Sequence, residues 1–84
     1  MAEKKITIYS TPVCGYCKMT KQYLTDNHIN YEDTDVSNDE AAAELMIKKS
    51  GQMGVPVIII EQNGQEEIIV GFQKNKLAEI LNIN

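Results

Sequence analysis

The sequence lacks the features of several large classes of protein. It has no excess of positive charge, because 8 lysine and arginine residues face 12 aspartates and glutamates and give a formal net charge of −4. Nucleic acid is therefore not expected as a main partner, since phosphate binding needs a basic surface. No apolar run approaches the roughly 20 residues of a membrane span, and residues 1–10 lack the apolar core of a signal peptide. We expect a cytoplasmic protein with no membrane partner.

Cysteine and histidine are scarce as well. The chain holds two cysteines, Cys14 and Cys17, and one histidine. A structural zinc site usually takes four such ligands, so an intrachain zinc site is not expected. A permanent disulfide across so short a loop would add only about 2 kcal/mol, and the cytoplasm would tend to reduce it. The spacing of the cysteines and the expected compartment favour a reversible dithiol/disulfide couple.

What the sequence does contain is enough apolar residues for one small folded domain. Hydrophobic residues make up 43% of the 84 residues, which is ordinary for a globular protein and too many for a disordered one. The length leaves room for a single domain, which we take as residues 1–84.

Local patterns predict seven elements. Alternation of β-branched residues and helical spacing of apolar residues indicate, in chain order, a strand at 4–10, a helix from 15 to about 28, a weaker strand at 30–36, a helix through 40–49, strands at 55–60 and 65–70, and a helix at 74–82. Ser37 stands three residues before Glu40, which is a capping-box pattern, and Gly51 is a plausible end for the second helix.

The order of these elements predicts an α/β fold. The order is β-α-β-α-β-β-α, in which helical crossovers suit parallel pairing of the first three strands. The Asn63-Gly64 pair is a hairpin signal, so the last two strands should run antiparallel. We expect a mixed four-stranded sheet with helices on both faces.

The two cysteines stand where the first strand meets the first helix. If Cys14 is the N-cap of that helix, its sulfur faces the unpaired N–H groups of Tyr16 and Cys17 and the positive end of the helix dipole. Such surroundings favour a thiolate nucleophile. Cys17 would lie within the first turn, close enough to form a disulfide. Lys18 and Lys21 add positive potential from positions that we expect to be solvated.

Three stretches together resemble a known family. They are YSTPVCGYC at 9–17, GQMGVPVIII at 51–60 and IIVGF at 68–72, the last followed by a helix. With these stretches the whole chain looks like a glutaredoxin-like protein of the thioredoxin fold, which implies a three-layer α/β/α architecture. The resemblance implies that Cys14 is the attacking thiolate and Cys17 the buried resolving thiol.

The same resemblance implies a substrate groove. The Val55–Pro56 bond should be cis and turn the backbone of Val55 toward Cys14, where it would pair with an extended substrate segment. The other residues that we assign to substrate binding are Thr11, Pro12, Tyr16, Gly71 and Phe72.

The subclass is indicated by where the chain departs from the pattern of glutathione-dependent glutaredoxins. Those proteins typically carry lysine where this chain has Thr11, threonine where it has Gly54, and an aspartate after the fourth strand, where 70–73 reads VGFQ. Gly15 also replaces their usual proline, although Tyr16 keeps their aromatic residue. The GF pair before the last helix looks more like the NrdH-type redoxins, which accept electrons from thioredoxin reductase and pass them to ribonucleotide reductase.

The first hypothesis is therefore a monomeric thiol–disulfide oxidoreductase that reduces protein disulfides, ribonucleotide reductase among them, and is recharged by thioredoxin reductase. No tightly bound cofactor and no metal are expected. One alternative is a glutaredoxin with glutathione as its reductant. An alternative of another class is an iron–sulfur carrier, in which two chains each donate Cys14 to a cluster.

Overall fold

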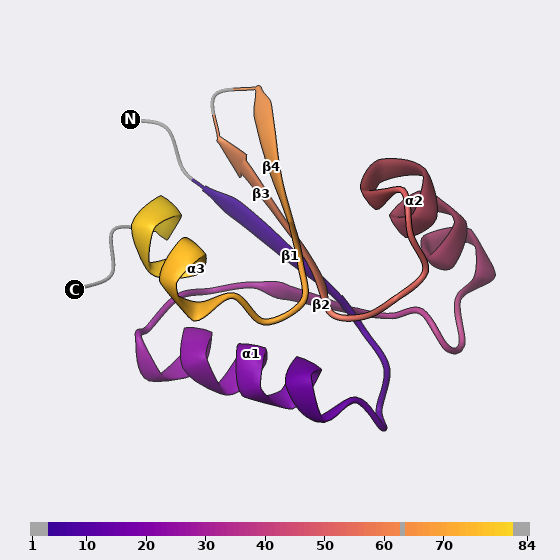
Figure 1. The fold of residues 1–84 in the computed structure, drawn as a ribbon, viewed down its shortest axis with the longest axis horizontal. Coiled ribbons are helices and arrows are strands. Elements are labelled where there is room, and N and C mark those ends of the chain that lie inside the picture. The colour runs from indigo at the N-terminus through magenta and orange to yellow at the C-terminus, as the bar shows by residue number, and fades with distance from the viewer. Residues whose placement is uncertain (1–3, 63, 82–84) are drawn as a thin grey trace.

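The computed structural model describes residues 4–62 and 64–81. The predicted order of seven elements is confirmed, as Figure 1 shows: β1 (Lys5–Ser10), α1 (Gly15–Asp26), β2 (Glu32–Asp35), α2 (Glu40–Ser50), β3 (Val57–Gln62), β4 (Gln65–Val70) and α3 (Lys74–Leu81). Of the predicted features, Asn63 and the last residue of the third helix, Asn82, lie outside the described residues. No helix in the described ranges is long and apolar enough to cross a membrane.

The strands form one mixed sheet in the order β2-β1-β3-β4. β1 and β2 are parallel, and β3 and β4 form the expected antiparallel pair. The prediction that the first three strands are parallel was wrong, because β3 runs antiparallel to β1 and pairs Val57 with Tyr9. The connection through α2 leaves β2 at Asp35, beside Ser10, and returns to the same end of the sheet. β3 therefore begins where β1 ends.

Helices cover both faces of the sheet, so the predicted three-layer architecture is confirmed (Figure 1). Alternation along the strands sends their side chains to two cores. α1 and α3 contribute Leu24 and Leu77 to the larger core, whose strand members are Ile6, Ile8, Ile58, Ile60 and Ile69. α2 contributes Met46 to the smaller core, with Tyr9, Val57 and Ile59.

The start of α2 differs from the prediction. Asp39 is its N-cap and accepts a hydrogen bond from Ala42 N–H at 3.0 Å. Ser37 does not cap the helix, because its hydroxyl donates to Asp35 Oδ1 at 2.6 Å. Aspartate is as good an N-cap as serine, so the local pattern allowed both residues. The predicted end at Gly51 is confirmed, where φ is 76°, a conformation that glycine adopts without strain.

The buried β3 strand should carry much of the stability. Ile58 is fully buried and pairs with Ile8 and Ile69 on either side. We predict that Ile58→Ala lowers the free energy of unfolding by about 2–5 kcal/mol and that Ile58→Val lowers it by about 0.5–1.5 kcal/mol, because each leaves a cavity. Urea denaturation followed by circular dichroism measures both. Ile47→Ala, at a position 38% exposed on α2, is the control, and a loss there as large as at Ile58 would contradict the packing argument.

Candidate redox site

Cys14 is the N-cap of α1, as predicted. After β1 ends at Ser10, a turn closes when Cys14 N–H donates to Thr11 O at 3.3 Å. Cys14 has extended backbone angles (φ −89°, ψ 112°), and its Sγ accepts a hydrogen bond from Cys17 N–H at 3.1 Å. Within the described residues Cys17 provides the only backbone donor to this sulfur, so the second donor expected from Tyr16 is not formed.

Cys17 lies in the first turn of α1 and is fully buried, whereas Cys14 is half-buried. Both are free thiols in this structure. Burial and, after it, the hydrogen bond with Cys14 raise the pKa of the Cys17 thiol to about 11. A hydrogen bond from the Thr11 backbone and the charge of Lys21 act the other way. Cys17 therefore keeps its proton at neutral pH, next to an accessible sulfur.

Two further loops meet the cysteine pair. The Cys14 thiol donates to Val55 O across 3.8 Å, although the residues lie 41 positions apart. The Val55–Pro56 bond is cis, as the resemblance implied. Pro56 O in turn accepts a hydrogen bond from Gly71 N–H at 2.8 Å. Gly71 has φ 81°, which explains a glycine there. The structure thus brings Thr11 and Val55 into contact with Cys14, and Pro56, next to Val55, is bonded to Gly71.

The surface around these loops is apolar. Val13, Tyr16 and Met53 are 92%, 65% and 78% exposed, and they stand in the segments that carry Cys14 and Val55. Pro12 is also exposed. Val13 was not predicted as a site residue. Its position between Pro12 and Cys14 was the signal in the sequence that could have indicated it. Met53 lies two residues before Val55, and its position beside the GVP stretch was the corresponding signal.

Phe72 belongs to the packing of the larger core. It is half-buried, and its ring meets the Tyr23 ring edge-on, with centroids 5.9 Å apart. Its predicted place in the substrate groove stays a prediction.

A polar cluster beside the site was not expected from the sequence. Lys21 Nζ donates to Asp33 Oδ2 at 3.0 Å, and Ser10 Oγ donates to Asp33 Oδ1 at 2.6 Å. The hydrogen bond with Asp33 raises the pKa of Lys21. Lys21 is thus paired with Asp33 while 25% of its side chain stays exposed, and this pairing was not predicted. Its position four residues after Cys17, on the same face of α1, was the signal that pointed inward.

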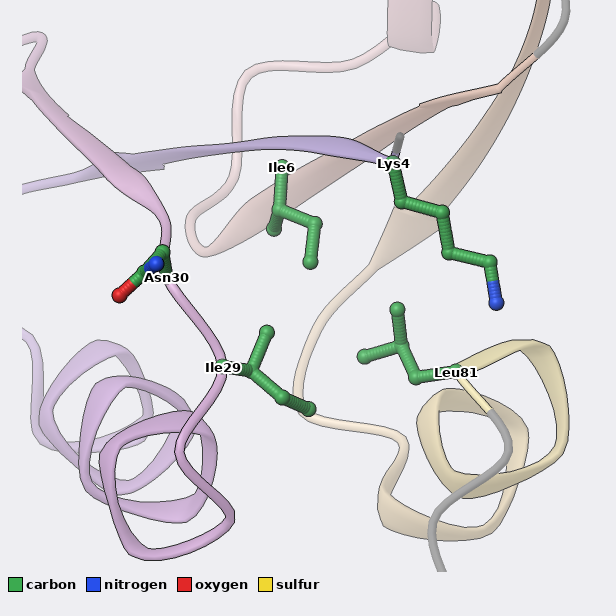
Figure 2. Close-up of a pocket in the computed structure, with 5 residues that line it drawn as sticks. All are labelled: Lys4, Ile6, Ile29, Asn30 and Leu81. Carbon is green, nitrogen blue, oxygen red and sulfur yellow. The ribbon is translucent and has the colours of Figure 1, made fainter. Parts of the chain in front are cut away.

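The described chain also has a pocket away from the cysteine pair. A pocket of 460 Å³ lies at the far end of β1 from Cys14, where Ile6, Ile29 and Leu81 converge with Lys4 and Asn30 (Figure 2). Lys4 Nζ there donates to Ile80 O at 2.9 Å, near the end of α3. No group of three or more histidine, cysteine, aspartate or glutamate residues within 4–62 and 64–81 is arranged to hold a metal ion.

Comparison with known proteins identifies the family. Residues 6–65 match the family model for glutaredoxin. The chain belongs to the glutaredoxin family. It is 45% identical over 76 residues to a glutaredoxin-like 8.6 kDa protein in the rubredoxin operon of Clostridium pasteurianum, covering 90% of this chain and 96% of that one.

Solved structures agree with this assignment. The crystal structure of a mutant of the thioredoxin-like protein BC3987 superposes with a TM-score of 0.84 at 35% identity, covering 95% of this chain and 97% of that one. The glutaredoxin-like NrdH-redoxin of Escherichia coli superposes with a TM-score of 0.76 at 25% identity, covering 90% and 93%. The resemblance to glutaredoxin-like proteins of the thioredoxin fold is thus confirmed.

The two thiols of this glutaredoxin-family protein should differ in reactivity. We predict that iodoacetamide at pH 7 modifies Cys14 first, because a thiol with a pKa of about 11 is ionised to only about one part in ten thousand. In the folded protein the rate at Cys17 should keep rising with pH and level off only near 11, whereas in concentrated urea it should level off near 9. Tandem mass spectrometry assigns the modified residue. Equal rates at both cysteines in the folded protein would contradict the burial argument.

Proposed function

We propose that the protein is a cytoplasmic thiol–disulfide oxidoreductase that acts through Cys14 and Cys17. The Cys14 thiolate attacks one sulfur of a substrate disulfide, forms a mixed disulfide and releases the other sulfur as a thiolate. Cys17 then loses its proton and attacks Cys14 Sγ, so that the second substrate thiolate leaves and the Cys14–Cys17 disulfide remains. The observation that carries the proposal is the half-exposed Cys14 sulfur at a helix start, with a buried thiol one turn away.

The resolving step is favoured by the first step. The hydrogen bond and the charge of Cys14 both raise the pKa of Cys17. Once Cys14 is held in a neutral mixed disulfide, its negative charge no longer acts on Cys17. The positive charge of Lys21, which lowers the pKa of Cys17, remains. Formation of the mixed disulfide therefore eases deprotonation of the thiol that must break it.

A protein disulfide is the substrate that suits the surroundings. An extended segment can pair with the backbone of Val55 by strand addition, which places its sulfur near Cys14. Thr11, Pro12, Pro56 and Gly71 form the adjoining loops. Val13, Tyr16 and Met53 offer apolar contacts to side chains of a protein partner. Ribonucleotide reductase is one such substrate that the NrdH-like features suggest.

Thioredoxin reductase is the reductant that we propose. Glutathione carries carboxylates that need cationic or polar partners, and Thr11 stands where glutathione-dependent relatives carry lysine. Lys18 is exposed, and Lys21 is already paired with Asp33. The similarity to an NrdH-redoxin described as having a thioredoxin-like activity profile supports the same choice. Reduction by glutathione is the second candidate, favoured by the aromatic Tyr16 after the first cysteine.

A coupled assay distinguishes the two reductants. We predict that the protein reduces insulin disulfides with NADPH and thioredoxin reductase at least tenfold faster than with NADPH, glutathione and glutathione reductase. The reason is the shortage of cationic partners for glutathione around Cys14. Loss of NADPH absorbance measures both rates.

Each control in this assay tests one part of the proposal. Cys14→Ser should abolish turnover with either reductant. Turnover with glutathione alone would overturn the choice of reductant and leave the oxidoreductase proposal standing. No turnover with either, together with visible absorbance in anaerobically purified protein, would favour an iron–sulfur carrier instead.

The roles of the two cysteines can be tested by trapping. We predict that Cys17→Ser accumulates a stable mixed disulfide between Cys14 and a disulfide-containing protein, because the resolving thiol is gone. Non-reducing electrophoresis shows the adduct, and added dithiothreitol removes it. Cys14→Ser is the matched control and should form no such adduct. An adduct formed by Cys14→Ser but not by Cys17→Ser would reverse the assignment.

A further inference from the structure

The side-chain amide of Gln52 makes hydrogen bonds with both backbone polar groups of Gly54. Gln52 stands in the loop between α2 and β3, two residues before Gly54. Its Oε1 accepts a hydrogen bond from Gly54 N–H at 2.6 Å, and its Nε2 donates to Gly54 O at 2.9 Å. Ser50 Oγ lies 3.4 Å from the same Nε2 and also donates to Met46 O at 2.7 Å, near the end of α2. The side-chain amide thus occupies the place that a neighbouring strand would take.

This arrangement determines which backbone groups the loop offers to a partner. Both groups of Gly54 are taken by Gln52, and Pro56 O is taken by Gly71 N–H. Val55 N–H makes no hydrogen bond to any residue within 4–62 and 64–81. Among the residues that the structure describes, Val55 O meets only the Cys14 thiol, at 3.8 Å. The pairing groups left to an incoming segment are therefore those of Val55, the residue against Cys14.

The lack of a side chain at Gly54 leaves space for the Gln52 amide. A Cβ atom built on Gly54 would lie 2.8 Å from Gln52 Oε1, closer than real Cβ contacts come. A side chain at 54 would therefore force the end of the Gln52 side chain to shift, which disturbs its hydrogen bonds to Gly54. The reason for glycine at 54 is therefore its contact with the Gln52 side chain, and not a backbone conformation that only glycine adopts.

We propose that Gln52 is a positioning residue that sets the register of the substrate segment on Val55. This inference rests on the proposed function. With the Gly54 groups closed, an extended segment has one place to pair. A register shift by one residue would move a substrate sulfur by about 3.3 Å, as large as the roughly 3–3.5 Å over which reacting atoms must meet. Gln52 thus acts on protein disulfides through Val55, without touching the sulfur chemistry.

Isosteric replacement of Gln52 tests the proposal. Gln52→Glu keeps an acceptor for Gly54 N–H but cannot donate to Gly54 O. We expect kcat/KM for insulin disulfides to fall by about 3- to 10-fold, mainly through KM, as for one lost hydrogen bond. The rate with bis(2-hydroxyethyl) disulfide, which has no peptide backbone, should stay within about 2-fold of wild type. Gln65→Glu, which adds the same charge in β4, should leave both rates unchanged.

A second variant breaks the same contact from the other partner. Gly54→Ala should give the same selective loss, and the double variant Gln52→Glu/Gly54→Ala should be no worse than the poorer single variant, because the effects share one interaction. Hydrogen exchange of the backbone amide of residue 54, followed by NMR, should be slow in wild type and faster in Gly54→Ala. Thermal unfolding verifies that each variant is folded.

The outcomes separate this inference from the proposed function. A selective loss with insulin supports the positioning role. Equal losses with both disulfides, or no loss with either, would overturn it while the oxidoreductase proposal stands. Additive effects in the double variant would overturn it as well. A wild-type protein inactive toward both disulfides would overturn the proposed function, and the role of Gln52 with it.

Discussion

The redox site depends on one hydrogen bond, from Cys17 N–H to Cys14 Sγ. It exists because β1 ends at Ser10 and α1 begins at Gly15, which makes Cys14 the residue with extended angles and Cys17 a residue of the first turn. Within that first turn, Cys17 lies on the inward face and is fully buried, whereas Tyr16 is 65% exposed. An accessible sulfur and a protected thiol follow from this single choice of helix start.

The topology of the sheet supplies the other half of the site. Because β3 runs antiparallel to β1, its beginning lies beside the end of β1, and the loop before it reaches Cys14. A parallel β3, which the helical crossover had suggested, would carry Val55 and Pro56 to the opposite end of the sheet. The direction of β3 is thus what allows two segments 41 residues apart to form one surface.

The features predicted correctly from the sequence were those set by a few neighbouring residues. Period-two and helical patterns gave the element order, and the C-x-x-C position gave the N-cap at Cys14. The direction of β3 could not be read in this way, because a crossover of that length permits either. The cap at Asp39 and the contacts of Lys21 and Gln52 depend on which of several available partners the folded chain brings close. Such contacts leave no periodic signal.

Chemistry and recognition therefore rest on separate parts of this small domain. The reactivity of the cysteine pair follows from the start of α1 and the burial of Cys17, whereas the backbone offered to a partner follows from Gln52 and Gly54. A side chain at 54 would be incompatible with the present position of Gln52, although it would not touch the first turn of α1. The choice of partner can then change with residues 52 and 54 while the dithiol stays the same.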